Sequence, residues 1–464
     1  MTKPRYPKGC SDWSQVLGET SPDPSDPAYV FVVHFNNGNV NLNNRNNRFA
    51  VRAVRSVARA SECKSAKASY RELHDAWKRA RRNKIPSTNQ LDFESKLTDN
   101  LLDLQDRINA GTWSPLPTTC FVATRPKARE IHAPDFSDRI VHHWLMARIE
   151  RDFERIFIFD SFANRKGKGS HAAVDRVRQF VRQVHSGQGN GWYLQLDIAN
   201  CFNTIPRRLL WEIVKRRMQK IGTPILVQRV AHALLRSSPT ASGVIHRASP
   251  AERAMVPAHK RLENAPPGRG IAIGNLSSQF FANVFLNELD QFVKHELKAQ
   301  RYVRYVDDFV LVHHDREQLE RWRDQIEVFL RDRLKLELKA DQRLRPLRDG
   351  IDFLGYVIFP THTRVRRRVV QHARASFAAW EDRHLRGDAM RGTPDDFRHI
   401  QSVIASYEGH FDRANARRLR GQLDARFPWI ASARRSRRFR LRDEGRFVSI
   451  QTHGSRHAAS EEQA

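Results

Sequence analysis

Residues 302–312 read Tyr302-Val303-Arg304-Tyr305-Val306-Asp307-Asp308-Phe309-Val310-Leu311-Val312. β-branched and aromatic residues flank two adjacent carboxylates, a pattern that predicts a β-hairpin with the acids at its turn. Adjacent acids repel each other and gain little from an exposed turn. A divalent cation held between them and a third carboxylate would explain the pair, and oxygen-only ligation suits Mg²⁺. Without that third acid, an ordinary exposed hairpin with acidic turn residues is the better explanation of the motif.

A third carboxylate follows an apolar run, Trp192-Tyr193-Leu194-Gln195-Leu196-Asp197-Ile198. An acid at the end of a buried strand is costly unless it is paired or bound to metal. Three aspartates on two neighbouring strands suit two-metal nucleotidyl transfer, in which one metal activates a primer hydroxyl and the other neutralises the leaving pyrophosphate. We therefore expect Asp197, Asp307 and Asp308 to meet at one site.

Composition points to a nucleic-acid partner. The chain has 464 residues, a formal net charge of +29 and a pI near 10.7, which suits a polyanion, with nucleic acid ahead of an anionic membrane. It has no apolar run long enough for a transmembrane helix and no apolar leader at its start. Cys10, Cys63, Cys120 and Cys201 form no Cys-x-x-Cys pair, which favours a reducing cytoplasm and argues against a structural zinc site.

The spacing of apolar residues along the chain predicts both helices and strands. Helices are expected from residue 66, over 93–108, 138–153, 206–220 and 318–334, and a basic hairpin over 118–133. A strand is expected at 336–338, and 372–429 is helical and arginine-rich. The order from 191 to 359 is strand–helix, helix–hairpin, helix–strand, which predicts a small α/β sandwich with mostly antiparallel strands.

Six segments, in order, resemble motifs of reverse transcriptases. Asp197 with Phe202, residues 270–279, Tyr305–Asp308 and Phe353–Tyr356 resemble the palm motifs, and the basic hairpin and the 165–170 loop resemble the fingers motifs. The resemblance covers about 70–430. It implies an α+β right-hand polymerase with fingers, a palm with an antiparallel sheet and helices, and a helical thumb.

The same resemblance divides the chain into five parts. An asparagine-rich segment, 1–65, precedes fingers at 66–190 and a palm at 191–371, which carries a basic, proline-rich insertion at about 236–268. A thumb at 372–430 and a basic, disordered tail at 431–464 follow.

Site residues follow from the matched motifs. Asp197, Asp307 and Asp308 would be catalytic and, with Ile198, would bind two Mg²⁺ ions, for which Mn²⁺ could substitute. Phe202, Ile273, Gly274 and Gln279 would bind the nucleotide, with Phe202 as the steric gate that selects deoxynucleotides. Lys127 and Arg129 would close on the triphosphate, although Arg125 is equally placed by spacing.

The primer and the template complete the expected site. Phe353, Leu354, Gly355 and Tyr356 would form the primer grip that fixes the 3′ end. Arg165, Lys166 and Lys168 in the glycine-bearing loop would contact the template backbone. Family members often carry a lysine near residues 339–343, and the sequence does not decide which cation there, if any, protonates pyrophosphate.

Within the superfamily, Ile273-Gly274-Asn275-Leu276-Ser277-Ser278-Gln279 and the 165–171 run resemble reverse transcriptases of diversity-generating retroelements. Most relatives carry glutamine where Ile273 stands. Isoleucine has no donor or acceptor, so checking of the nascent base pair should weaken, unless Ile273 merely packs. The resemblance implies errors opposite template adenines, a structured template-repeat RNA, dNTPs, an RNA/DNA heteroduplex and a small basic accessory protein.

The asparagine run 36–47 allows two interpretations. It fits a low-complexity loop or β-ribbon. Because asparagine codons are rich in adenine, the first sixty or so codons could instead overlap or derive from a template repeat.

Two other functions remain open from the sequence. One is a related bacterial reverse transcriptase of anti-phage defence or of a group II intron, although the short Cys-free tail argues against the endonuclease module of an intron enzyme. The other is an inactive nucleic-acid-binding scaffold that keeps the palm fold.

Overall fold

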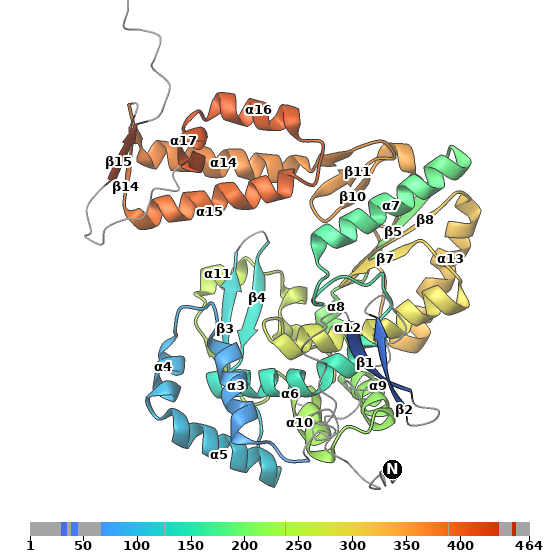
Figure 1. Cartoon of the computed structure of the whole chain (residues 1–464), viewed down its shortest axis with the longest axis vertical. Helices are drawn as coiled ribbons and strands as arrows, with labels where there is room; N and C mark the ends of the chain where they lie inside the picture. Colours follow the sequence, from blue (N-terminus) through green and yellow to red (C-terminus); the bar gives the residue numbers. More distant parts are fainter. Residues whose placement is uncertain are drawn as a thin grey trace, which may run out of the picture.

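The computed structural model describes residues 66–124, 127–236, 238–387 and 389–435, and the strand backbones Tyr29–His34 (β1), Asn39–Asn44 (β2) and Val448–Gln451 (β15). β1 and β2 pair as an antiparallel ribbon. The rest of the asparagine-rich segment 1–65 and most of the 431–464 tail lie outside the described residues. Over the described part, the mixed α+β class predicted from the sequence is confirmed (Figure 1).

A four-stranded antiparallel sheet lies at the centre of the chain. Its order is β7 (Tyr302–Tyr305), β8 (Asp308–His313), β5 (Trp192–Asp197) and β9 (Arg343–Pro346). β7 and β8 form the predicted hairpin, with Tyr305 opposite Asp308. The strand expected at 336–338 is wrong, because that segment makes only a bridge between Leu338 and Ile198, and the edge strand is β9 instead.

Both faces of this sheet are covered. Along β8, Val310 and Val312 join the core beneath α7 (Ser170–Gln188), whereas Phe309 and Leu311 join the core that includes α12 (Leu276–Gln291) and α13 (Arg316–Phe329). Successive strand residues point to opposite faces, so an uninterrupted apolar run is what burial on both faces requires. α13 continues as a π-helical turn, Leu330–Leu334, which ends at Lys335 in the left-handed conformation.

Helices α3 (Tyr70–Arg81), α4 (Thr88–Ser95), α5 (Leu97–Ala110) and α6 (Phe136–Glu154) precede the sheet. A capping box between Ser69 and Glu72 begins α3, and the Asp135 side chain caps α6. The single helix predicted over 93–108 is two helices, because Lys96 has a non-helical backbone (φ −128°, ψ 47°). Gly111, with a φ of 76°, ends α5.

A second sheet has the order β4 (Arg129–Ala133), β3 (Thr118–Ala123) and β6 (Val244–His246). β6 runs parallel to β3 and comes from the segment predicted to be an insertion. That segment also contains α11 (Pro250–Ala254) and two 3₁₀ turns, Ala258–Lys260 and Leu262–Asn264, and it buries Val256 and Leu262. It therefore packs against the rest of the chain through apolar side chains of its own.

Helices α8 (Cys201–Thr204), α9 (Arg207–Lys220) and α10 (Ile225–Arg236) connect the two sheets. α8 and α9 follow β5, and α10 leads to β6. A π-helical turn, Phe292–Glu296, extends α12. Among the described helices, none is long and apolar enough to cross a membrane.

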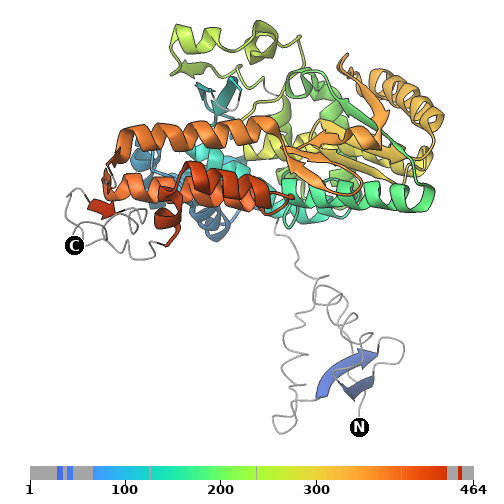
Figure 2. The same cartoon turned by 90° about the horizontal axis from the view of Figure 1, so that it is seen from above.

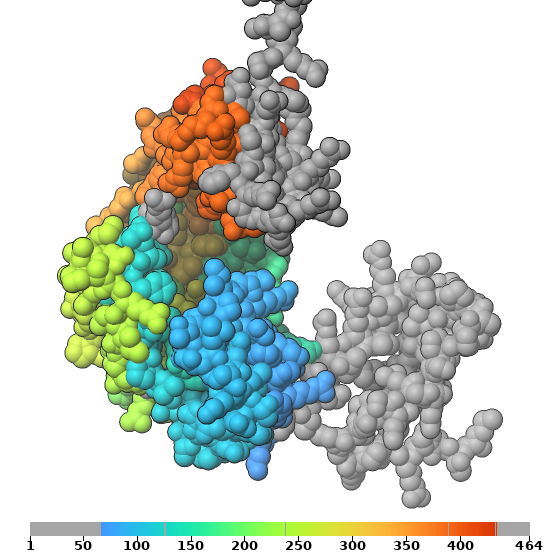
Figure 3. Space-filling view, turned by 90° about the vertical axis from the view of Figure 1, so that its left-hand side faces the viewer, coloured from blue at the N-terminus to red at the C-terminus, as the bar shows by residue number. Residues whose placement is uncertain are grey.

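The C-terminal part starts with strands β10 (Ile351–Phe353), β11 (Tyr356–Ile358) and β12 (Thr363–Val365). Helices α14 (Arg367–His384), α15 (Pro394–Phe411), α16 (Arg417–Arg426) and α17 (Trp429–Arg435) surround a core of their own. β13 (Leu385–Arg386) and β14 (Ala389–Gly392) join α14 to α15, which run side by side in Figure 2. In Figure 3 the surface is hollowed between these helices (orange) and the N-terminal helices (blue).

Candidate active site

Strand pairing brings the three predicted aspartates together. Asp197 ends β5 and lies opposite Asp308, the first residue of β8, in the antiparallel register. Asp307 occupies the turn just before β8, and its carbonyl accepts a hydrogen bond of 3.1 Å from the amide of Ile198. The carboxylates are thus carried by adjacent strands rather than by long loops, which fixes their spacing.

The turn that carries Asp307 has an unusual backbone. Val306 has a φ of +58°, which is rare for a β-branched residue. A positive φ at the first central position is the pattern of a type II′ turn, which fits the twist of a hairpin. The buried Arg304 supports the turn, because its Nη1 donates to the Val306 carbonyl at 2.9 Å while its guanidinium pairs with Asp290 at 2.6 and 2.7 Å.

Electrostatics around the carboxylates favour a bound cation. Burial, and then the charge of Asp197, raise the pKa of Asp307 to about 6. Burial also raises the pKa of Asp308 to about 7, against a hydrogen bond from Gln195. Oδ1 of Asp197 is buried and has no hydrogen-bond partner. Crowded carboxylates that resist ionisation and an unpartnered oxygen form a donor set that fits a hard divalent ion.

Lys339 supplies a positive charge at this site. Its Nζ lies 2.5 Å from Oδ2 of Asp197, and its backbone amide donates to the Asp197 carbonyl at 2.8 Å. The sequence pointed to residues 339–343 without selecting one of them. The bridge between Ile198 and Leu338 aligns this segment beside the end of β5. Of the cations in 339–343, it therefore brings Lys339 next to Asp197.

Phe202 lies on α8, which starts after Asn200 in the left-handed conformation (φ +46°). Its ring is half-buried, and its carbonyl accepts a hydrogen bond of 2.8 Å from the amide of Ile271. The predicted gate residue therefore lies beside the predicted nucleotide-pocket segment. The Asn200 side chain also binds the His259 carbonyl at 2.6 Å.

The nucleotide-pocket segment lies against strand β4. The Ile273 carbonyl accepts a hydrogen bond of 2.8 Å from the amide of His132. Gly274 has a φ of +127°, and a Cβ there would come within 2.8 Å of the His132 carbonyl, so only glycine fits. The side chains of Ile273 and of Gln279, on α12, are half-buried.

The hairpin β3–β4 places one predicted cation in electrostatic range of the carboxylates. Burial raises the pKa of Asp307, and Arg129 is among the positive charges that oppose the rise. Lys127 is exposed, and Arg125 lies outside the described residues.

The predicted primer grip forms a tight turn between β10 and β11. Leu354 and Gly355 both have positive φ, +49° and +91°, which is the pattern of a type I′ turn. The ring of Tyr356 stacks on that of His410 in α15 with their centroids 4.1 Å apart, and its hydroxyl donates to the His410 carbonyl. Nε2 of His410 lies 3.3 Å from the Gly355 carbonyl. Sequence reasoning missed His410, which no local pattern connects to this turn.

The three predicted template contacts differ in their surroundings. The Arg165 guanidinium is buried and bonds Glu154 and the carbonyls of Ile158 and Ser161, and its template contact stays a prediction. Lys168 donates to the Phe159 carbonyl at 2.9 Å and lies over the Phe159 ring. Lys166 is 90% exposed, with one ion pair of 3.3 Å to Glu150.

Comparison with known proteins adds an independent line of evidence. Residues 123–358 match the family model described as reverse transcriptase (RNA-dependent DNA polymerase). The chain is 25% identical over 315 residues to protein YkfC of Escherichia coli (strain K12), covering 60% of this chain and 76% of YkfC. It is 23% identical over 344 residues to the group II intron-encoded protein LtrA of Lactococcus lactis subsp. cremoris, covering 59% of this chain and half of LtrA.

Solved structures also match. Apo telomerase from Candida tropicalis, truncated from its C-terminal domain, aligns with a TM-score of 0.42 at 10% identity. That alignment covers 54% of this chain and 55% of the telomerase chain.

Proposed function

The chain belongs to the reverse transcriptase family of RNA-directed DNA polymerases, and on this premise we propose that it copies a template-repeat RNA into adenine-mutagenised cDNA for a diversity-generating retroelement. Family membership implies divalent-metal nucleotidyl transfer on a nucleic-acid template with dNTPs. The proposal adds a specific template and a characteristic error.

The three aspartates would hold the metal. Asp197, Asp307 and Asp308, with Ile198 beside them, would bind two Mg²⁺ or Mn²⁺ ions, which when bound lower the pKa of a primer hydroxyl and neutralise the leaving pyrophosphate. The chain contributes rigid placement, since Asp197 and Asp308 sit on paired strands and Asp307 lies in the tight turn between β7 and β8. Lys339, whose ammonium lies beside Asp197, would pass a proton to the leaving pyrophosphate.

Other side chains would orient the substrates. Arg129, with Lys127 nearer the hairpin tip, would bind the triphosphate by charge. The Phe202 ring would lie under the sugar and exclude a 2′-hydroxyl. The 353–356 turn would hold the primer end, and the exposed Lys166 would contact the template backbone.

Ile273 supports the error-prone part of the proposal. Its carbonyl is fixed by His132, so its position in the pocket is constrained, while its half-buried side chain retains exposed surface. That surface offers bulk to an incoming nucleotide and no hydrogen bond to its pairing edge. A pocket without a polar contact there tolerates a mispaired base at a lower free-energy cost.

The domain roles are part of the same proposal. Residues 66–190 would act as fingers, 191–371 as palm and 372–430 as thumb, and α14, which begins at Arg367, spans the boundary between palm and thumb. The surface charge would grip an RNA/DNA heteroduplex through its backbone. A structured template RNA and a small basic accessory protein would complete the machinery, and residues 1–65 would derive from the template repeat.

Primer extension on an adenine-containing RNA template with Mg²⁺ tests the proposal, with every product sequenced. The variant Asp307→Asn/Asp308→Asn serves as the inactive control, and any accessory protein encoded nearby is added in parallel. Errors concentrated opposite adenine, and reduced by Ile273→Gln, are expected. Absence of cDNA under all these conditions would contradict the polymerase assignment.

A second candidate function follows from the match to LtrA, which is named as a group II intron-encoded protein. Under this alternative the chain is an intron or anti-phage defence reverse transcriptase. The same assay separates the two, because faithful copying of adenine would favour the alternative.

A further inference from the structure

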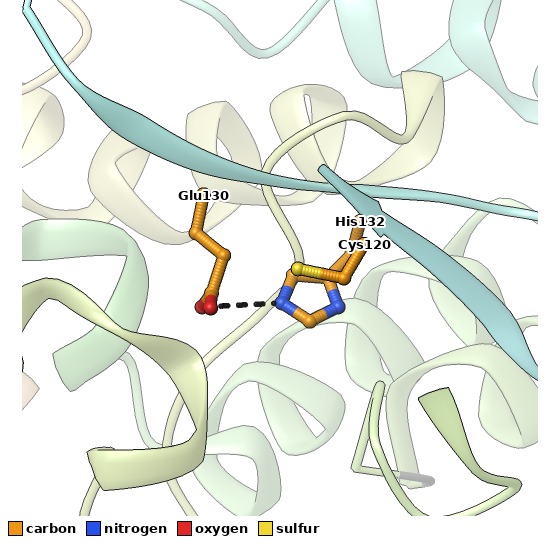
Figure 4. A group of neighbouring side chains, drawn as sticks. All are labelled: Cys120, Glu130 and His132. Carbon is orange, nitrogen blue, oxygen red and sulfur yellow. Dashed lines mark hydrogen bonds and ion pairs between the residues drawn. The ribbon is translucent and has the colours of Figure 1, made fainter. Parts of the chain in front are cut away.

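Three potential metal ligands from the β3–β4 hairpin lie together away from the aspartates. Cys120 on β3 pairs across the strands with His132 on β4, and Glu130 precedes His132 on the same face. All three are buried, and their potential ligand atoms lie within 4.8 Å of one another. Figure 4 shows the Glu130 carboxylate directed at the imidazole, with the Cys120 sulfur beside the ring.

The contacts of His132 are compatible with a tautomer that leaves Nε2 free to bind a metal. The Thr118 hydroxyl donates its only proton to the Pro239 carbonyl at 3.3 Å. With the hydroxyl proton directed at Pro239, Nδ1 of His132, 3.4 Å from the same oxygen, is the donor in that contact. In a neutral imidazole the lone pair is then on Nε2, which faces Oε2 of Glu130 at 3.3 Å.

In this tautomer two acceptors face each other in a buried site, an arrangement that a cation between them stabilises. Oε2 of Glu130 already accepts the Leu262 amide at 2.8 Å. Two ligand atoms of a tetrahedral zinc ion, each about 2.0–2.1 Å from the metal, lie about 3.3 Å apart. The spacing between Nε2 and Oε2 matches that edge.

We propose that Cys120, Glu130 and His132 form a zinc site that is separate from the catalytic carboxylates. Zn²⁺ binds Nε2 of His132, a Glu130 oxygen and the Cys120 thiolate, whose proton passes to solvent, and a water completes four-coordination. The ion, one thiolate, one carboxylate and a neutral imidazole carry no net charge, which suits a buried site. The Nδ1–H bond to Thr118 holds the ring in the required tautomer.

This site lies behind the nucleotide pocket. The His132 amide bonds the Ile273 carbonyl, and Glu130 bonds the Leu262 amide in the 3₁₀ turn that follows α11. Zinc there fixes the hairpin against both segments. A Cys-x-x-Cys search of the sequence misses this site because the ligands meet by cross-strand pairing.

Metal analysis of the full-length protein tests the inference. The Asp307→Asn/Asp308→Asn background removes the catalytic carboxylates as a source of bound metal. Protein purified from zinc-supplemented medium is expected to carry about one zinc per chain, and Cys120→Ser at least tenfold less. Cys201→Ser, which removes the other buried thiol of the described residues, is expected to retain it.

Cobalt substitution provides a readout that does not depend on the variant folding. Co²⁺ bound in the parent protein is expected to show tetrahedral d–d bands and a thiolate-to-cobalt charge-transfer band. If metal-free protein takes up neither Zn²⁺ nor Co²⁺, the inference is overturned. A proton on Nε2 of His132 would then be the positive group that faces Glu130. Polymerase activity plays no part in either outcome, so this test is independent of the proposed function.

Discussion

The ammonium of Lys339 lies 2.5 Å from Oδ2 of Asp197. This contact ties the segment after α13 to the end of β5 and sets one cation against three crowded carboxylates. Lys339 is 46% exposed on its side chain, so the pair is accessible to substrate.

Replacing Lys339 should therefore affect chemistry more than substrate binding. We expect Lys339→Met to lower kcat by about 10²-fold, within the range of general acid catalysis, with a smaller change in the KM for dNTP. Steady-state kinetics across pH would check this, with Lys339→Arg as the charge-retaining control. Equal losses in both variants, with an unchanged pH profile, would assign Lys339 only a structural role.

Asp308→Asn should separate activity from stability. The amide keeps an oxygen for the Gln195 hydrogen bond, 3.2 Å in the parent, while removing a buried charge. Loss of extension by at least about 10³-fold is expected, since a metal ligand is lost. The midpoint of thermal unfolding in EDTA should stay equal or rise, because repulsion from Asp197 and Asp307 is relieved. A clear fall in that midpoint would contradict the repulsion inferred for the site.

The buried carboxyl group of Asp138 should make the free energy of unfolding depend on pH. Burial, assisted by the charge of Asp135, raises its pKa from 3.8 to about 7, although Oδ2 accepts the Leu116 amide at 2.7 Å. The folded protein therefore binds the proton of Asp138 more tightly than the unfolded chain does. The stability gained from the bound proton is fully present below the unfolded pKa of 3.8 and is lost as the pH rises to about 7.

Asp138→Asn removes that titration. Between pH 5 and pH 8 the free energy of unfolding of the parent should fall relative to the variant, by roughly 3 kcal/mol at most. Urea unfolding at both pH values measures the difference. A constant difference would show that Asp138 titrates normally.

Arg165 and Lys166 provide a matched pair from one loop. Arg165→Ala should destabilise the protein by about 3 kcal/mol, because it leaves Glu154 and two carbonyls without their buried partner. Lys166→Ala should change the free energy of unfolding by no more than about 0.5 kcal/mol. It should weaken RNA binding and reduce the slope of log K against log salt concentration by about one. Thermal unfolding and binding titrations at several salt concentrations measure both effects, and the reverse pattern would favour Arg165 over Lys166 as the template contact.

His410 couples the C-terminal helices to the primer turn. His410→Ala removes the ring stacked on Tyr356 and the contact with the Gly355 carbonyl. We expect a severalfold higher KM for primer–template and shorter products, with little change in single-nucleotide chemistry. His399→Ala, an exposed histidine on the same helix, is the control. Identical behaviour of the two variants would contradict the coupling.

The sequence predicted those parts of the molecule whose pattern is local. The Asp307–Asp308 hairpin follows from alternation across a short turn, and Asp197 from a single acid ending an apolar strand. The apolar runs that form β5 and β8 are short and rich in β-branched and aromatic residues, as is typical of strands buried on both faces. The central sheet could therefore be predicted from the sequence.

Features made by distant contacts could not be anticipated. The break at Lys96 is a backbone conformation with no proline or glycine to signal it. The roles of Lys339 and His410 depend on segments far apart in the chain, and Cys120 meets Glu130 and His132 only through strand register. The internal role of Arg165 depends on carbonyls that no sequence pattern places.

The central sheet also limits how a protein partner can attach. At one edge, β9 carries Arg343, Arg345 and Pro346, and proline has no amide to donate to another strand. At the other edge, β7 is covered by residues 160–162, through the bonds of Arg304 to Asp160 and Phe162. The β7 edge is thus closed to a further strand, while the β9 edge presents two arginines and one residue without an amide, so a partner strand could be added only beside β9 and would meet positive charge there.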